Sequence, residues 1–320
     1  MAWDGVPWFV ESTAASEETL RLVVEAAAGG GEGIIGPADL LVTALDVPGT
    51  SVEVGIGAMV ARKRGGAVGQ AYAARMPTPE TVDIAATGAD GPRSDLIIAR
   101  VEDPFGGENW PQPEDPTVGP YVFTRVLTDV PPGTRSVQDV LPGSTAVTLA
   151  RVDVPASTSI ITPVMVTDLR QIAAPRTQTS RRYLHSAWAT PDDVGPVVDV
   201  WEDFPLGARW QERIPEWATH VEVHADLTGL LHPDTTEARG TLRVILDEQF
   251  GAPIPFLTTH AGRHSAVAGN RFAIAPEDRG QILPIAVQGK GTAGKTGVLR
   301  ADDGTVLTLE VTYSQAPVIA

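Results

Sequence analysis

The sequence predicts a mainly β protein, with an N-terminal β-rich domain carrying one short helix, followed by a C-terminal antiparallel β-sandwich or jelly-roll-like domain. Three observations support this prediction. Apolar residues alternate with a period of two over most of the chain, as they do in half-buried strands. The 320 residues include 32 Gly and 27 Pro, which suits many short strands joined by turns. Only one stretch, close to the start of the chain, shows a helical period.

That stretch predicts a helix over residues 16–28. Ser16 is a favourable N-cap, and the two glutamates that follow it suit the positive end of a helix dipole. One apolar stripe then follows at helical spacing, formed by Leu20, Val23, Val24 and Ala27. Three consecutive glycines at 29–31 end the predicted helix.

Short strands separated by Gly, Pro and Asp turns fill the rest of the first domain. We predict them at residues 39–45, 51–62, 70–76, 81–86, 93–101, 121–128 and 145–154. Residues 104–120 contain five prolines and predict one long surface loop. Residues 163–170 predict a short closing turn of helix.

A length of 320 residues is about two domains' worth. We predict domains at residues 1–174 and 189–320, joined by a linker over residues 175–188, because the chain there is polar, contains proline and lacks periodicity. The clearest strands of the second domain are residues 219–227, 240–247, 281–288 and 305–313. Strands at this spacing without helices between them favour an antiparallel sandwich.

Composition excludes several classes of function. The formal net charge of −16 disfavours binding to nucleic-acid phosphates and to anionic membrane surfaces. The chain has no cysteine, so it forms neither disulfides nor thiolate metal sites. No apolar run approaches a membrane span, and the first residues lack the pattern of a signal peptide. We therefore expect synthesis in the cytoplasm and no membrane insertion.

The segment from Gly289 to Thr296 matches the phosphate-binding pattern G-x-x-x-x-G-K-[ST] in full. A P-loop needs a helix directly after the lysine, so that the helix N-terminus points at the phosphates. Residues 297–313 instead show strand alternation around an Asp-Asp-Gly turn. We interpret the segment as a hairpin loop and expect no nucleotide cofactor.

Two further patterns suggest chemistry but have simpler explanations. His220, Glu222 and His224 share one face of a predicted strand, yet alternate strand residues stand about 7 Å apart, too far to converge on one zinc ion without a bulge. His260 and His264 could complete a site, but nothing in the sequence requires it. Acidic pairs such as those at 192–193 and 202–203 invite a glycosidase interpretation, but 40 acidic residues make such pairs expected by chance. We predict no metal site and no catalytic residues.

Aromatic residues are the remaining candidates for contact with a ligand or partner. Tyr183, Trp188, Trp201 and Trp210 lie close together in sequence at the start of the second domain, where exposed rings could stack on sugars and buried rings could build the core or a subunit contact. Trp110, in the proline-rich loop, is the best candidate for contacting a partner protein.

The chain resembles the minor tail proteins of long-tailed phages that infect actinobacteria. In the first domain the resemblance follows the helix and the glycine run at 29–36, and then the segments DLLVTAL (39–45), GIGAMV (55–60), YAAR (72–75), RSDLIIARV (93–101), ARVDVPAST (150–158) and TDLR (167–170). In the second domain IPEWAT (214–219), RG (279–280) and GVLR (297–300) are similar to C-terminal β-sandwich modules of such proteins. These motifs are structural, and none marks a catalytic site.

This resemblance implies a non-enzymatic virion protein at the tail tip or baseplate, built into a trimer or ring with neighbouring tail proteins. Long loops and sheet edges also favour a homo-oligomer, because subunit contacts commonly cover unpaired edge strands. The alternative is a receptor-binding protein whose C-terminal sandwich attaches to host cell-envelope carbohydrate. A polysaccharide hydrolase is the weakest of the three hypotheses.

Overall fold

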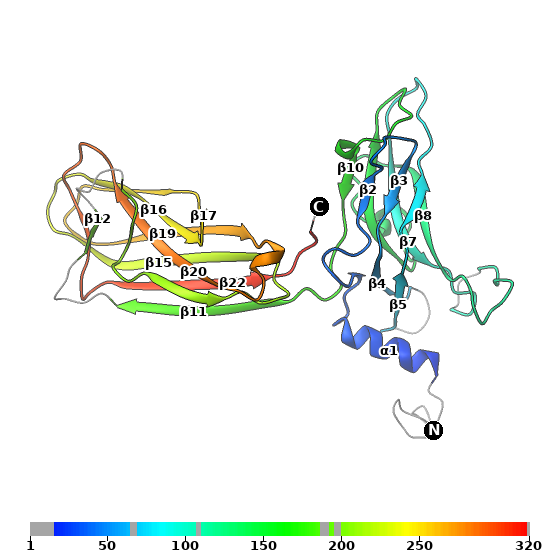
Figure 1. The fold of residues 1–320 in the computed structure, drawn as a ribbon, viewed down its shortest axis with the longest axis horizontal. Helices are drawn as coiled ribbons and strands as arrows, with labels where there is room; N and C mark the ends of the chain where they lie inside the picture. Colours follow the sequence, from blue (N-terminus) through cyan, green and yellow to red (C-terminus); the bar gives the residue numbers. More distant parts are fainter. Residues whose placement is uncertain (1–15, 65–68, 107–109, 186–191, 195–199, 319–320) are drawn as a thin grey trace. The chain divides into compact units, whose positions relative to one another are not determined.

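The computed structural model describes residues 16–64, 69–106, 110–185, 192–194 and 200–318. The chain divides into two compact units, of which unit 1 comprises residues 1–175 with 316–320, and unit 2 comprises residues 176–315. Both are built mainly of antiparallel strands, which confirms the predicted fold class (Figure 1).

Unit 1 contains three small sheets. A four-stranded sheet has the order β10-β9-β7-β8, and two three-stranded sheets have the orders β1-β4-β5 and β2-β3-β6. The strands are β1 (Gly33–Ile34), β2 (Val42–Ala44), β3 (Ser51–Val54), β4 (Gly57–Arg62), β5 (Ala71–Met76), β6 (Glu80–Asp83), β7 (Arg93–Val101), β8 (Val122–Val130), β9 (Ala146–Val154) and β10 (Val166–Asp168). The helices are α1 (Glu17–Ala27), α2 (Val137–Val140) and a 3-10 turn, Pro163–Met165.

Strand β7 is buried on both faces, which explains its nearly continuous apolar sequence. One face carries Ile97, Ala99 and Val101 into the main core of unit 1. The other face carries Leu96 and Ile98 into a smaller cluster that α2 helps to cover.

Two expectations about unit 1 need correction. The predicted strand 51–62 is two strands, because the chain turns between β3 and β4, where a Cβ on Gly57 would lie 2.6 Å from the Asp39 Cα atom. The helix α1 forms with its Ser16 cap, but its predicted apolar stripe is not buried as a whole, since Leu20 is 41% exposed. Instead the helix contacts the sheet through Val24 and through Arg21, whose Nε donates to Gln70.

Four arginines of the resemblance motifs bond carboxylates of unit 1. Each pairs with a carboxylate two residues away in the chain, as Arg93–Asp95, Arg100–Glu102, Arg151–Asp153 and Arg170–Asp168. These motifs therefore encode local ion pairs along or directly after strands of the four-stranded sheet.

Unit 2 is an antiparallel β-sandwich. One sheet has the order β11-β22-β15-β21-β12, with β19 beside β15, and the other has the order β13-β20-β16-β17, with β14 beside β20 and β18 beside β16. The strands are β11 (Thr177–His185), β12 (Asp192–Val194), β13 (Glu202–Asp203), β14 (Arg209–Arg213), β15 (His220–His232), β16 (Ala238–Leu246), β17 (Gln249–Phe250), β18 (Ile254–Thr258), β19 (Gly262–Ala273), β20 (Ile282–Gly291), β21 (Leu299–Ala301) and β22 (Val306–Ser314), with a 3-10 turn, Pro276–Asp278.

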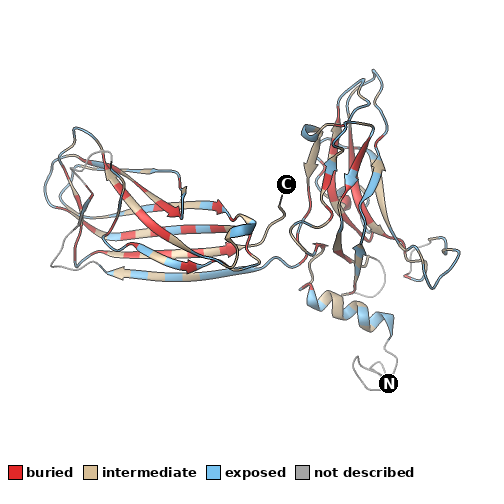
Figure 2. Cartoon of the chain, in the orientation of Figure 1, coloured by how far each residue is buried: buried red, intermediate tan, exposed pale blue. Residues whose placement is uncertain are grey.

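Alternate residues of these strands point into a single core, as the banding of buried residues in Figure 2 shows. Val221, Val223 and Ala225 of β15 face inward from one sheet. Leu242 and Val244 of β16 face inward from the other. The residues between them face outward, on the surfaces of the two sheets.

The predicted domain limits also need correction. The expected linker 175–188 contains β11, which pairs with β22 over nine residues from Thr177 to His185. Its polar sequence has no apolar alternation, so the sequence does not indicate this edge strand. The predicted second domain also ended too late, because Val318 belongs to unit 1, where its N–H donates to Pro37 and its carbonyl accepts from Arg170.

Candidate partner-binding surface

The candidate aromatic residues that are described in unit 2 do not share one surface. Trp188 lies outside the described residues. Tyr183 is 61% exposed on β11, in one sheet of the sandwich, whereas Trp201 directly precedes β13 of the other sheet. Trp210 is half-buried: it lies opposite the buried Ile285 and packs against the core, which limits the surface that it offers to a partner.

Trp201 belongs to a cluster on the outer face of its sheet. Its indole ring lies 4.1 Å from the guanidinium carbon of Arg243 on β16, and the ring of Phe250 on β17 lies 4.2 Å from the same carbon. The Nζ of Lys290 on β20 approaches the same indole at 5.1 Å. Cations at these distances from aromatic rings are held by the ring quadrupole. We call Trp201, Arg243, Phe250 and Lys290 the cation–aromatic cluster.

Arg243 and Phe250 are not among the residues identified from the sequence. The alternation of β16 indicates the position of Arg243, since Gly240, Leu242 and Val244 point inward and leave Arg243 on the outer face. The pairing that brings Phe250 to this arginine depends on a tight turn after β16, which the apolar pattern does not show.

Trp110 lies in a comparable arrangement in unit 1. Its ring is 4.6 Å from the guanidinium carbon of Arg100, and Arg125 lies 4.3 Å from the ring of Phe123. Both arginines donate to the carboxylate of Glu102, whose side chain is only 8% exposed. Trp110 is therefore half-buried and tied to the sheet, rather than extended on a loop as we expected.

The same contacts predict how stability depends on pH. Burial raises the pKa of Glu102, but hydrogen bonds from Arg125 and Arg100 outweigh it, so this pKa lies below its ordinary value. Bonds from Arg151 lower the pKa of Asp153 in the same way. A carboxyl with a depressed folded-state pKa contributes stability above its unfolded pKa, and this contribution is lost as the pH falls through the folded value.

We therefore expect the free energy of unfolding of unit 1 to decrease as the pH is lowered below about 4. Urea midpoints measured between neutral and acidic pH check this expectation. Glu102→Gln should lower stability at neutral pH and flatten the acid dependence. An unchanged acid slope in this variant would contradict the assignment.

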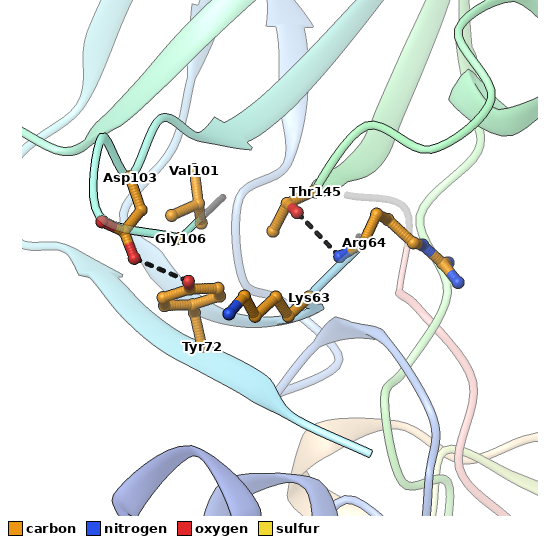
Figure 3. Close-up of a pocket in the computed structure, with 7 residues that line it drawn as sticks. All are labelled: Lys63, Arg64, Tyr72, Val101, Asp103, Gly106 and Thr145. Atoms are coloured by element: carbon orange, nitrogen blue, oxygen red, sulfur yellow. Dashed lines mark hydrogen bonds between the residues drawn. The ribbon is translucent and has the colours of Figure 1, made fainter. Parts of the chain in front are cut away.

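Two hollows in unit 1 differ greatly in what they can hold. The first, shown in Figure 3, is lined by Lys63, Tyr72 and Asp103 among others, and its volume of about 10 Å³ leaves room for roughly one water. The Tyr72 hydroxyl donates to Asp103 across it.

The second hollow is a groove of about 290 Å³ between strands β5 and β8. Leu40, Met59 and Ala99 contribute apolar side chains to it, and Arg75 and Glu80 contribute charges. In the described part of the chain, β5 pairs only with β4 and β8 only with β7, so both strands are sheet edges. An apolar groove bordered by two edge strands is a suitable acceptor for another protein segment.

The other candidate motifs lie on strands and turns of unit 2. Lys290 of the P-loop-like segment lies within β20, Lys295 pairs with Glu237, and strand β21 follows at Leu299, so no helix begins after the lysine. His220, Glu222 and His224 lie on the outer face of β15. Within the described residues, no group of three or more His, Asp or Glu side chains is placed to hold a metal ion. None of the helices described combines the length and apolar character that a membrane span requires.

Comparisons with known proteins give no family assignment. No family model matches the sequence, and no curated protein matches it. Among solved structures, the infectious bursal disease virus VP2 subviral particle is similar at 12% identity and a TM-score of 0.26, over 89% of this chain and 70% of that one. The insecticidal delta-endotoxin Cry8Ea1 from Bacillus thuringiensis is similar at 9% identity and a TM-score of 0.24, over 90% and 52% of the two chains. Likenesses this weak carry no functional argument.

Proposed function

We propose that this protein is a structural virion component, a minor tail protein of the tail tip or baseplate of a long-tailed phage, and that it assembles as a symmetric oligomer. In this proposal unit 1 is the docking module and unit 2 is the outward module. The protein acts without catalysis, so release of reducing sugar from envelope polysaccharide by the purified chain would contradict the proposal.

The resemblance motifs support a structural role. In unit 1 they occupy buried strands and local ion pairs, as Asp95 shows with a fully buried side chain bonded to Arg93. Residues of this kind build a fold and leave no reactive group exposed. The resemblance is therefore to proteins whose shared sequence serves architecture.

The observation that carries the proposal is the groove between β5 and β8. Unpaired edge strands invite pairing with another chain. By symmetry, a second copy offers the same two edges, so a closed ring or trimer can cover each groove with a neighbouring copy. We therefore assign the groove to contact between copies of this chain.

This assignment predicts a sharp difference between two adjacent alanines of β5. Ala74 is half-buried and lines the groove, whereas Ala73 is exposed and faces away from it. Ala74→Arg should fill the groove and convert the oligomer to a 33.7 kDa monomer in light scattering. Ala73→Arg, which adds the same charge to the same strand, should leave the oligomer intact.

Circular dichroism must show both variants folded. A wild-type protein that remains monomeric at high concentration, or equal dissociation of both variants, would contradict the assignment. Immunogold labelling of phage particles with an antibody against this chain tests the location, and we expect label at the tail tip. Label confined to the soluble fraction of the lysate would exclude a virion component.

One observation favours a second candidate function, the recognition of host-envelope carbohydrate by unit 2. The cation–aromatic cluster presents rings and hydrogen-bond donors together on the outer face of a sheet. Such a combination is suited to sugars, which have both apolar ring faces and polar edges.

A further inference from the structure

The strand register places the members of the cation–aromatic cluster side by side. Arg243 pairs with Gln288, and Thr241 pairs with Lys290, so Arg243 and Lys290 are diagonal neighbours on one face of β16 and β20. Phe250 pairs with Ile245 on the other side of β16 and extends the same face. Three members of the cluster thus lie on paired strands, which fixes the relative positions of their backbones, and Trp201 directly precedes β13.

The guanidinium of Arg243 is held in one orientation. The two rings contact it at 4.1 and 4.2 Å, and its Nε and Nη2 atoms donate to the Gln288 Oε1 at 3.0 and 2.8 Å. These contacts use one edge of the planar fork. A guanidinium has five N–H donors, so donors remain on its other edge.

The charge of Arg243 is not balanced by the described part of the protein. Five other arginines of unit 2, namely Arg181, Arg182, Arg209, Arg263 and Arg300, each pair with a carboxylate. Arg243 has no such partner among the described residues, and burial lowers its pKa. Asp203, the carboxylate that Gln288 also contacts, is paired with Arg209 instead. Arg239 adds an exposed cation on the same face of β16.

The geometry identifies the anion that suits this face. A planar guanidinium edge matches a carboxylate, which it binds through two parallel N–H···O bonds. Phe250 is 61% exposed, so its ring also offers an apolar surface beside the donors. A pyranose ring that carries a carboxylate satisfies both features at once, whereas a neutral sugar leaves the arginine unpaired and an acidic peptide side chain leaves the ring surface unused.

We propose that the outer face around Arg243 binds an acidic polysaccharide, with a sugar carboxylate on the guanidinium of Arg243 and the sugar ring against the exposed ring of Phe250. This proposal deepens the second candidate function and rests on it. It does not depend on the tail assignment, because a negative immunogold result leaves the ligand measurement unaffected.

The test is titration calorimetry of the full-length protein with oligogalacturonate, with its methyl-esterified neutral form and with poly-glutamate of similar length. Arg243→Gln should weaken oligogalacturonate binding by about tenfold or more, since a charge-assisted bidentate contact is lost. Arg243→Lys should weaken it by a similar factor of about ten, because a point charge does not replace the planar fork. Arg239→Gln is the matched control, since it removes the same charge from the same face of the same strand. Melting curves must show that each variant is folded.

Binding of oligogalacturonate alone, lost in both Arg243 variants and kept in Arg239→Gln, would support the proposal. Absence of binding to the wild type would overturn it. Equal losses in Arg239→Gln and Arg243→Gln would also overturn it, because they would show a diffuse charge effect. Equal binding of poly-glutamate would overturn the sugar assignment and identify an acidic protein surface as the partner.

Discussion

Replacing Asp95 by alanine is expected to lower the free energy of unfolding of unit 1 by about 3–4 kcal/mol. Asp95 is fully buried on β7 and accepts bonds from the Arg93 Nε and Nη2 atoms. It also accepts from the Asp129 N–H, at a residue whose φ is 57° in the strand opposite. The substitution removes the carboxylate but leaves the guanidinium, whose side chain is only 19% exposed, without its counter-charge.

The neighbouring strand supplies a matched control with the same sequence spacing. Asp153 bonds Arg151 as Asp95 bonds Arg93, but its side chain is 44% exposed. Asp153→Ala should therefore cost only about 1 kcal/mol, since the removed carboxylate is itself half-solvated, water can take its place, and the Arg151 Nη1 still donates to the Thr134 carbonyl. Urea unfolding gives the two losses, and hydrogen exchange of the β7 and β9 amides assigns them to unit 1. Equal losses would show that burial does not decide the strength of these pairs.

These pairs also show what could be predicted from sequence. The apolar run of residues 93–101 predicts β7 correctly, because a strand buried on both faces has a local signature. The capped start of α1 also has a local signature, formed by Ser16 and the two glutamates after it. The face of α1 that contacts the sheet has no such signature, because the contacts of Arg21 with Gln70 and Tyr72 depend on where β5 lies.

Strand β11 shows where local patterns fail. Its residues from Thr177 to His185 are mostly polar and none is buried, so neither face has an apolar signature. It is a strand because β22, more than a hundred residues later in the chain, offers a complementary edge. The placement of the candidate aromatic residues depends on distant strands in the same way. Trp201 and Trp210 lie nine residues apart and look alike in sequence, yet one lies on an outer face and the other packs against the core.

The buried histidine of unit 2 should have the second large effect. His232 is the last residue of β15 and has no exposed surface. Its Nδ1 lies 2.8 Å from the Val298 carbonyl oxygen, and its Nε2 lies 2.8 Å from the Thr236 carbonyl oxygen. Val298 directly precedes β21 and Thr236 lies two residues before β16, so one side chain contacts the chain at the start of a strand in each sheet of the sandwich.

His232→Leu should therefore lower the free energy of unfolding of unit 2 by about 2–3 kcal/mol, because leucine fills a similar space but lacks the ring N–H that a carbonyl oxygen accepts at this buried site. His264, whose ring centroid lies 6.2 Å away, provides the control. Its Nε2 lies 2.7 Å from the His260 carbonyl oxygen at an exposed site, where water can replace it. His264→Leu should cost about 1 kcal/mol or less. Losses of similar size in the two variants, measured by urea unfolding, would mean that His232 stabilises the sandwich through packing alone and not through hydrogen bonding.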